Sequence, residues 1–469
     1  MNTNSTAKIN KKQMLPIMLT AFITPFMGSS LNLAVPTMAN YFSAGAVSIG
    51  WVVTAYYLSS TTLLIPFGKI ADLYGKKKMF LTGIFLFAVF SILCSCAWSI
   101  ETVILFRLGQ GIGASMIFST NSALVASNFP VTVRGQMMGL SVMFTYLGLS
   151  AGPVLGGLLN ERLGWRSIFV FSFLFCLLSF ITSVTMLNDD RLDYNRESLK
   201  GTGESYSGKN RLDLPGCMMF TLSSGMFLFG LSNISTMGVA KAAFGISFFL
   251  IFIFVRIEMK TEEPVLDLKL FTESRAFTLS NVAALLNYGA SASISYLMSV
   301  YLQNVRGFSS DRAGLILIAT PIIQAFLSPL AGRLSDRYSP FKLASVGMLL
   351  TFTGIVMLIA TDMDTSIQYL VLSLAVIGMG FALFSSPNSN AIMSSAPKTQ
   401  YGVASSIMSA SRTIGQTTSM AIVTMIIGAV MGNVALASAP AEAIVTALKI
   451  AFVVNAVLCG VGIFCSARR

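Results

Sequence analysis

Long apolar runs separated by short polar turns make up most of the chain. Fourteen of these runs hold roughly 20 mostly apolar residues each, the length that an α-helix needs to cross a bilayer. We expect the spans at residues 13–35, 47–67, 79–98, 102–125, 135–159, 166–187, 213–233, 238–256, 277–303, 311–331, 342–361, 367–387, 402–430 and 445–466. The pattern predicts an all-α integral membrane protein with fourteen transmembrane helices.

Two polar stretches divide these runs into groups. Residues 188–210 are rich in Gly, Ser and charged side chains, and residues 256–275 form a second charged stretch. Six predicted helices precede the first stretch, two lie between the stretches and six follow the second. The expected organisation is an N-terminal six-helix half at 1–187, an inserted region with two helices at 188–275, and a C-terminal six-helix half at 276–469.

Composition and charge agree with a protein that sits in lipid. The chain is 54% hydrophobic and only 11% charged, whereas a soluble domain carries about 25% charged residues. The net charge is +12, and most basic residues fall in the loops that share one side if the helices alternate. The positive-inside rule then places both termini in the cytoplasm of a multi-pass plasma-membrane protein, so the charge reflects topology and not nucleic-acid binding.

Several function classes lack their sequence signals. The chain has no histidine, its six cysteines all fall in apolar runs, and no metal-ligand spacing is present. No P-loop sequence occurs, and the membrane segments hold no clustered nucleophile or acid–base set. We therefore expect no cofactor, no metal and no enzymatic activity.

A charged turn joins the second and third predicted helices. Gly68 and Gly75 allow a tight turn, and Asp72 between them is suited to a helix N-terminus or to a basic partner across the two halves. The alternative is a simple topological anchor of basic residues. A related run with Gly332 and Asp336 follows the second helix of the last six, which indicates an internal repeat of the kind found in transporters that alternate between two open states.

A ridge of small residues lies in the fifth predicted helix. Gly148, Gly152 and Gly156 are four residues apart and form one flat stripe that lets another helix approach closely. Pro153 lacks a backbone donor and can bend the helix, and Gly157 extends the small-residue surface. Plain close packing is the alternative interpretation of this ridge.

Together these two motifs resemble the major facilitator superfamily, in particular its fourteen-helix second drug:proton antiporter family. The resemblance implies that the charged turn is a latch that closes the cytoplasmic side. It also implies that the glycine ridge is the motif of exporters. The implied latch residues are Gly68, Asp72, Gly75, Lys76 and Lys77. The family often has Arg after the Asp, but Leu73 stands here, so Lys76 or Lys77 is expected to supply the basic partner.

Polar residues within the apolar runs are candidates for a central cavity. Arg107 and Gln110 resemble a family motif tied to proton coupling or to the central network, although an Arg this near a helix end can also extend to the surface. Arg412 lies roughly 15 Å into its helix, where backbone carbonyls or Asn are alternative partners. Asn32 and Asn287 complete the predicted cavity and coupling set, because their helices line the cavity in this superfamily.

The largest departure from the family lies in the first helix. Met27 occupies the position where the family usually has an Asp, and no acidic residue falls in the middle of a predicted span. Glu161 and Glu101, near the outer helix ends, are the remaining candidates for a proton site. Sodium coupling, exchange and facilitated diffusion are the alternatives. Without a central acid, neutral or anionic amphiphiles fit better than dications.

The sequence as a whole predicts a secondary active transporter. We expect it to export small amphiphilic compounds, as multidrug efflux antiporters do, by alternating access energised by an ion gradient, with protons favoured over sodium. The rival within transport is a uniporter, exchanger or importer of an organic anion or metabolite, and a non-transporting membrane sensor is the rival from another class. The expected partners are the substrate, the coupling ion and the bilayer, and we expect a monomer.

Overall fold

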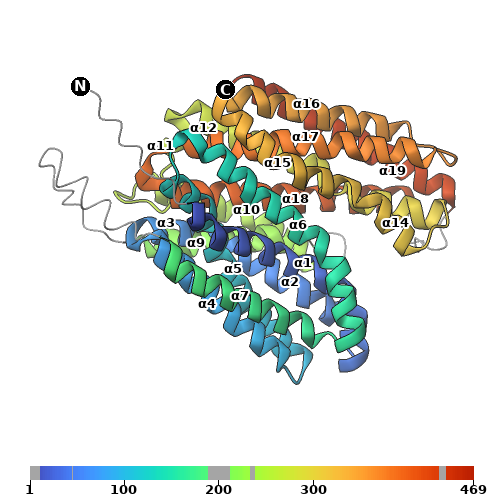
Figure 1. Cartoon of the computed structure of the whole chain (residues 1–469), viewed down its shortest axis with the longest axis horizontal. Coiled ribbons are helices and arrows are strands. Elements are labelled where there is room, and N and C mark those ends of the chain that lie inside the picture. Colours follow the sequence, from blue (N-terminus) through green and yellow to red (C-terminus); the bar gives the residue numbers. More distant parts are fainter. Residues whose placement is uncertain (1–10, 45, 188–211, 233–237, 432–439) are drawn as a thin grey trace, which may run out of the picture.

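The computed structural model describes residues 11–44, 46–187, 212–232, 238–431 and 440–469, and these residues form helices joined by short turns. Two groups of helices lie side by side: the blue-to-teal helices of the first part of the chain, and the yellow-to-red helices of the last part (Figure 1). The two groups meet mainly where α6 packs on α15 and where α18 packs on α3 and α5.

The first helix group comes from the N-terminal part of the chain. Helix α1 packs on α6 and α7, α4 packs on α5 and α7, and α2 packs on α5. Its helices are α1 (Met14–Phe42), α2 (Ala46–Thr62), α3 (Leu64–Tyr74), α4 (Lys76–Ser95), α5 (Ile100–Asn128), α6 (Val131–Leu163) and α7 (Arg166–Met186).

The second helix group repeats this arrangement with different sequences. Helix α12 packs on α18 and α19, and α16 packs on α17 and α19. The group contains α11 (Lys269–Glu273), α12 (Arg275–Ser291), α13 (Ile294–Val300), the π-turn η2 (Tyr301–Val305), α14 (Ser310–Leu317), α15 (Ala319–Arg337), α16 (Pro340–Ile359), α17 (Ile367–Ser394), α18 (Tyr401–Met431) and α19 (Ala441–Ala467).

A helical hairpin lies between the two groups in sequence. It consists of α9 (Leu214–Ser232) and α10 (Gly238–Glu258), which pack on each other. Helix α9 contacts α2 and α3 of the first group and α18 of the second group. The hairpin therefore touches both groups at once.

The helices have the length and hydropathy of membrane spans. Twelve of them pass this test within the described residues, and α2 with α3 makes a thirteenth span that bends by 46°. The predicted span at 277–303 is divided into α12, α13 and η2 by a break at Ala292 and Ser293, where the Ser293 amide donates to Ser419 Oγ of α18. The all-α, multi-span fold class is confirmed, and the count of fourteen stays a prediction.

The outward-facing surfaces of the helices are apolar. Helix α10 exposes Phe248, Phe249 and Phe252, each more than half accessible. Soluble monomers rarely expose contiguous apolar surface of this kind. Lipid is the solvent that such a surface requires.

Candidate functional site

Asp72 joins the two helix groups at one end of the bundle. Its carboxylate accepts hydrogen bonds from the backbone amides of Gly402 (2.7 Å) and Val403 (2.9 Å) in the first turn of α18. Free amides and the helix dipole favour an anion at this place. Gly68, one turn earlier, allows the approach, because a Cβ there would lie 2.6 Å from the Gly402 carbonyl oxygen. The predicted position of Asp72 at a helix N-terminus is therefore what the structure has.

Asp336 makes the equivalent contact from the second group to the first. It lies near the end of α15 in the second group, and its carboxylate accepts from the amides of Gly135 (2.6 Å) and Gln136 (2.9 Å) in the second turn of α6. Gly332 permits the approach, since its Cβ would lie 2.1 Å from the Gly135 carbonyl oxygen. The two carboxylates form a symmetric pair of contacts, here called the latch, and the end of the bundle that holds them is the latch end.

The basic residues of the charged turn have separate partners. Lys76 Nζ, at the start of α4 in the same group, lies 3.5 Å from Asp72 Oδ1. Lys77 donates to the Leu187 carbonyl oxygen at 2.5 Å and so caps the C-terminus of α7. Gly75 joins α3 to α4 with φ of +108°, a backbone conformation that favours glycine.

The glycine ridge of α6 faces α1 along its length. A Cβ at Gly148 would lie 2.1 Å from the Phe22 carbonyl oxygen, and one at Gly152 would lie 1.8 Å from Ser29 Oγ. Gly156 meets Ser30 in the same way, at 2.4 Å from its Cβ. Pro153 and Gly157 also lie in α6, with Pro153 exposed. The ridge sets the spacing between α1 and α6, next to the interface with α15.

Replacing Gly148 with alanine is expected to destabilise the protein by about 1–3 kcal/mol, because the new methyl group forces α1 away from α6. The measurement is the thermal unfolding temperature of the purified variant in detergent. The matched control is Gly245→Ala in α10, where a Cβ meets nothing within 4 Å. An unfolding temperature of Gly148→Ala equal to that of the control would contradict the packing described for the ridge.

Arg107 and Gln110 lie inside the first helix group. The Arg107 side chain is fully buried, its Nε donates to the Val52 carbonyl oxygen at 3.0 Å, and its guanidinium lies 4.2 Å from the centre of the Tyr56 ring. It also donates to the Gln110 amide oxygen, and Gln110 donates to Ser91 Oγ at 2.7 Å. The structure thus places this pair among α2, α4 and α5 rather than at the interface between the groups.

Close helix packing makes that position possible. A Cβ at Gly111 would lie 2.5 Å from the Tyr56 carbonyl oxygen, and one at Gly113 would lie 2.6 Å from the Phe87 amide. Because these glycines bring α2 and α4 against α5, the guanidinium reaches the α2 backbone instead of solvent. Arg107 Nη2 is buried without a hydrogen-bond partner among the described residues.

Arg412 lies between the two helix groups. It extends from α18 and lies 5.3 Å from the ring centre of Tyr288 in α12 and 5.9 Å from that of Tyr146 in α6. Tyr57 of α2 is 46% exposed and lies within electrostatic reach of Arg412. Within the described part of the chain, no carboxylate forms an ion pair with Arg412. We call Arg412, Tyr57, Tyr146 and Tyr288 the central cage.

The cage is held by contacts from the second group. The Tyr288 hydroxyl lies 3.1 Å from Ser385 Oγ of α17, and its ring packs on Phe381 at 5.9 Å between ring centres. Gln324 of α15 lies beside the Tyr146 hydroxyl. A cation surrounded by aromatic faces and neutral donors can bind planar or anionic groups. The three tyrosines and Gln324 carried only a general sequence signal, as polar residues in apolar runs.

The other predicted cavity residues have different surroundings. Asn287 is fully buried in α12, and neither its Oδ1 nor its Nδ2 has a partner in the described part of the molecule. Asn32 lies in α1, and its side chain is outside the described residues. Met27, at the position of the family's Asp, is fully buried and accepts a contact from Ser172 Oγ at 3.0 Å. The space next to α7 is therefore occupied by a thioether.

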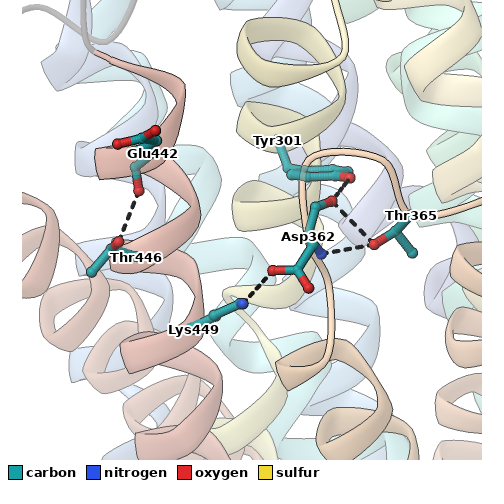
Figure 2. A network of polar contacts seen from close by, with 6 residues as sticks. All are labelled: Tyr301, Asp362, Thr365, Glu442, Thr446 and Lys449. Carbon is teal, nitrogen blue, oxygen red and sulfur yellow. Dashed lines mark hydrogen bonds and ion pairs between the residues drawn. The ribbon is translucent and has the colours of Figure 1, made fainter.

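The acidic residues at the opposite end of the bundle lie at its surface. Glu101 and Glu161 are both exposed. Asp362 follows α16 and pairs with Lys449 of α19, and the Tyr301 hydroxyl donates to the Asp362 carbonyl oxygen at 2.6 Å (Figure 2). A cavity of about 560 Å³ adjoins this network, lined by Asp362, Met363, Asp364, Thr365, Glu442, Val445 and Thr446. Sequence reasoning missed Lys449, because a single Lys in an apolar run does not indicate its partner.

One family model and several known relatives match most of the chain. The family model described as Major Facilitator Superfamily matches residues 17–257 and 281–468. The chain is 29% identical to the riboflavin transporter RibZ of Clostridioides difficile over 85% of this chain and 84% of the relative. It is 30% identical to the multidrug resistance protein Stp of Mycobacterium tuberculosis over 90% of this chain and 77% of the relative.

Solved structures share the fold. The human organic anion transporter MFSD10 superposes with a TM-score of 0.66 at 15% identity, covering 96% of this chain and 99% of the other. The proton:xylose symporter XylE superposes with a TM-score of 0.68 at 14% identity, covering 96% and 94%. At such low identity these two likenesses concern the fold alone.

Proposed function

The chain belongs to the major facilitator superfamily, and we propose that it exports small amphiphilic compounds across the plasma membrane by alternating access. The family and the relatives establish that it is a multi-span membrane transporter and not an enzyme. The proposal adds the direction of transport, the energy source and the kind of substrate. An ion gradient energises the export, with protons as the expected coupling ion.

The latch is the observation that supports alternating access. Asp72 and Asp336 each accept two backbone hydrogen bonds from near the start of a helix of the other group, and both contacts lie at the same end. In the proposed cycle both contacts break when that end opens. Two rigid groups that separate at one end and close at the other give alternating access. The basic residues near this end support a cytoplasmic location for it, as the positive-inside rule expects.

The central cage supports a substrate class. Arg412 offers a positive charge, Tyr146 and Tyr288 offer aromatic faces beside it, and Tyr57 lies close by. Planar aromatic compounds that are neutral or anionic fit this combination better than cations do. The relatives named as a riboflavin transporter and a multidrug resistance protein are in keeping with this class. Export is supported by the glycine ridge on α6.

A second function within transport has its own support. Met27 fills the place of the coupling carboxylate, and the cage has no ion-paired acid among the described residues. A uniporter, an exchanger or an importer of an organic anion or metabolite needs no proton carrier in the cage. The direction and the driving force therefore have to be measured together.

Flux through purified protein in proteoliposomes distinguishes these functions. Riboflavin, anionic fluorescein and cationic ethidium would be loaded in turn, with a pH gradient and then a sodium gradient imposed. We expect riboflavin or fluorescein to move against its own gradient when protons flow the other way, and ethidium to move least. Flux that does not depend on the pH gradient or the sodium gradient would contradict energised export and favour the uniporter. Transport of ethidium alone would contradict the proposed substrate class.

A further inference from the structure

Two carboxylates meet at the latch end of the inserted hairpin, outside the sites described above. Asp213 directly precedes α9, and Glu258 is the last residue of α10. A Cβ on Gly216 would lie 2.2 Å from Asp213 Oδ2 and 2.6 Å from Glu258 Oε1. The two oxygens are therefore less than about 5 Å apart, close enough for each charge to oppose the other strongly.

These two oxygens are buried and have no hydrogen-bond partner among the described residues. Glu258 is only 3% exposed. The other oxygen of each group is satisfied: Glu258 Oε2 accepts from the Leu266 amide at 3.1 Å, and Asp213 Oδ1 accepts from the Gly216 amide at 3.0 Å. A buried acceptor without a donor is costly, so the geometry calls for a proton between the free oxygens.

Within the part of the chain that the structure describes, few charged and titratable groups lie around the pair. Lys69 of α3 acts on Glu258 electrostatically, and the Cys217 thiol of α9 lies near Asp213, Glu258 and Lys69. The nearby carboxylate of Asp267 binds the Lys269 amide and Gln400 instead. Among the described residues Lys69 balances one ionised carboxylate, and a second leaves a buried negative charge.

Lys69 connects the pair with the latch. It lies on α3 next to Gly68, which contacts α18, and one turn before Asp72, which holds α18. The hairpin itself contacts α2, α3 and α18. Because α9 contacts both α3 and α18, a separation of α3 from α18 changes the surroundings of Lys69 and of the two carboxylates.

We propose that Asp213 and Glu258 share one proton between their free oxygens, and that the affinity of this site for its proton is linked to the latch through Lys69. Loading takes a proton from water at the latch end and forms one O–H bond between the free oxygens. Release leaves two carboxylates beside Lys69, which then holds α3 against the hairpin. Opening the latch removes Lys69 and strengthens proton binding, and by linkage the proton favours the open latch. Export itself can occur without this site, and the proposal rests on the proposed function only for the role of the latch.

Infrared difference spectroscopy tests this proposal on the full chain in lipid nanodiscs, with no need for transport. The signal is the C=O band of a protonated carboxyl group, followed as the pH is raised. In the wild type we expect a band that persists to about pH 6–8, well above the range of free carboxyl groups. The band should be lost at neutral pH in Glu258→Gln and Asp213→Asn, and unchanged in Glu262→Gln, which alters an exposed glutamate of the neighbouring loop.

Two further variants are expected to strengthen proton binding instead of removing the band. Their result does not depend on whether the first two variants fold. Lys69→Met removes the balancing charge, and Asp72→Asn weakens the latch. Each is expected to raise the pH at which the band disappears, by about one unit for Lys69→Met. A wild-type band confined to about pH 4, or one that survives in both Glu258→Gln and Asp213→Asn, would overturn the shared proton. If the band of Asp72→Asn disappears at the same pH as that of the wild type, the link to the latch is overturned.

Discussion

Replacing Asp72 and Asp336 together with asparagine is expected to abolish sustained flux, with a loss of more than about 100-fold. Each carboxylate accepts two backbone hydrogen bonds from the other helix group, and a hydrogen bond to a charged group contributes about 1.5–3 kcal/mol. An asparagine amide accepts with one oxygen only and carries no charge for the helix dipole. The state closed at the latch end therefore loses most of its population, and the cycle cannot be completed.

The single variants and a control separate this effect from general damage. Asp72→Asn or Asp336→Asn alone should reduce flux in proteoliposomes about tenfold, because the other contact remains. Asp364→Asn makes the same chemical change at an exposed position of the opposite end and should retain wild-type flux. Wild-type flux in the double variant would show that the carboxylates do not act as a latch.

Replacing Arg412 with alanine is expected to reduce transport of anionic fluorescein by about tenfold or more. The guanidinium is the positive charge placed between Tyr146 and Tyr288, and a charge-assisted hydrogen bond to a bound anion contributes about 1.5–3 kcal/mol. Transport of ethidium should be retained or improved, because the variant removes a repelling charge. The measurement is the KM and maximal flux of each compound in proteoliposomes.

A conservative variant and a matched control sharpen this test. Arg412→Lys keeps the charge but loses the planar face that stacks on tyrosine, so it should transport fluorescein at an intermediate KM. Arg468→Ala removes an arginine that stacks on Phe464 at 4.0 Å but is exposed near the end of α19, and it should behave as wild type. An equal loss for fluorescein and ethidium in Arg412→Ala would mean that the residue has a structural role only.

The sequence indicated where Asp72 would lie because the chemistry of a tight turn is local. Glycine and aspartate at fixed spacing indicate a tight turn with an anion at a helix end, and the repeat near Asp336 pointed to a second copy. The partners were beyond reach, since Gly402 is 330 positions from Asp72 and Gly135 is 201 positions from Asp336. The same holds for the glycine ridge, whose close approach was expected but whose partner, α1, follows only from the packing of α1 on α6.

The predicted cavity set depends on tertiary contacts that a linear pattern cannot contain. Arg107 and Arg412 look alike in sequence, yet Arg107 binds the Val52 carbonyl inside one group and Arg412 stacks between the groups. The break at Ser293 is invisible as well, because its cause is a hydrogen bond to Ser419 on another helix. The pairing of Asp213 with Glu258 requires the α9–α10 hairpin to close, which brings together two carboxylates that are far apart along the chain.

The distance between the two groups at the latch end tests the central claim most directly. Spin labels at Thr132 at the start of α6 and Arg337 at the end of α15, both exposed, would be introduced into a chain whose native cysteines are replaced. Double electron–electron resonance would then be recorded in nanodiscs. We expect one short-distance population in the otherwise native chain and a second, longer population in the Asp72→Asn, Asp336→Asn variant. A single distance that is the same in both proteins would contradict a latch that closes this end of the transporter.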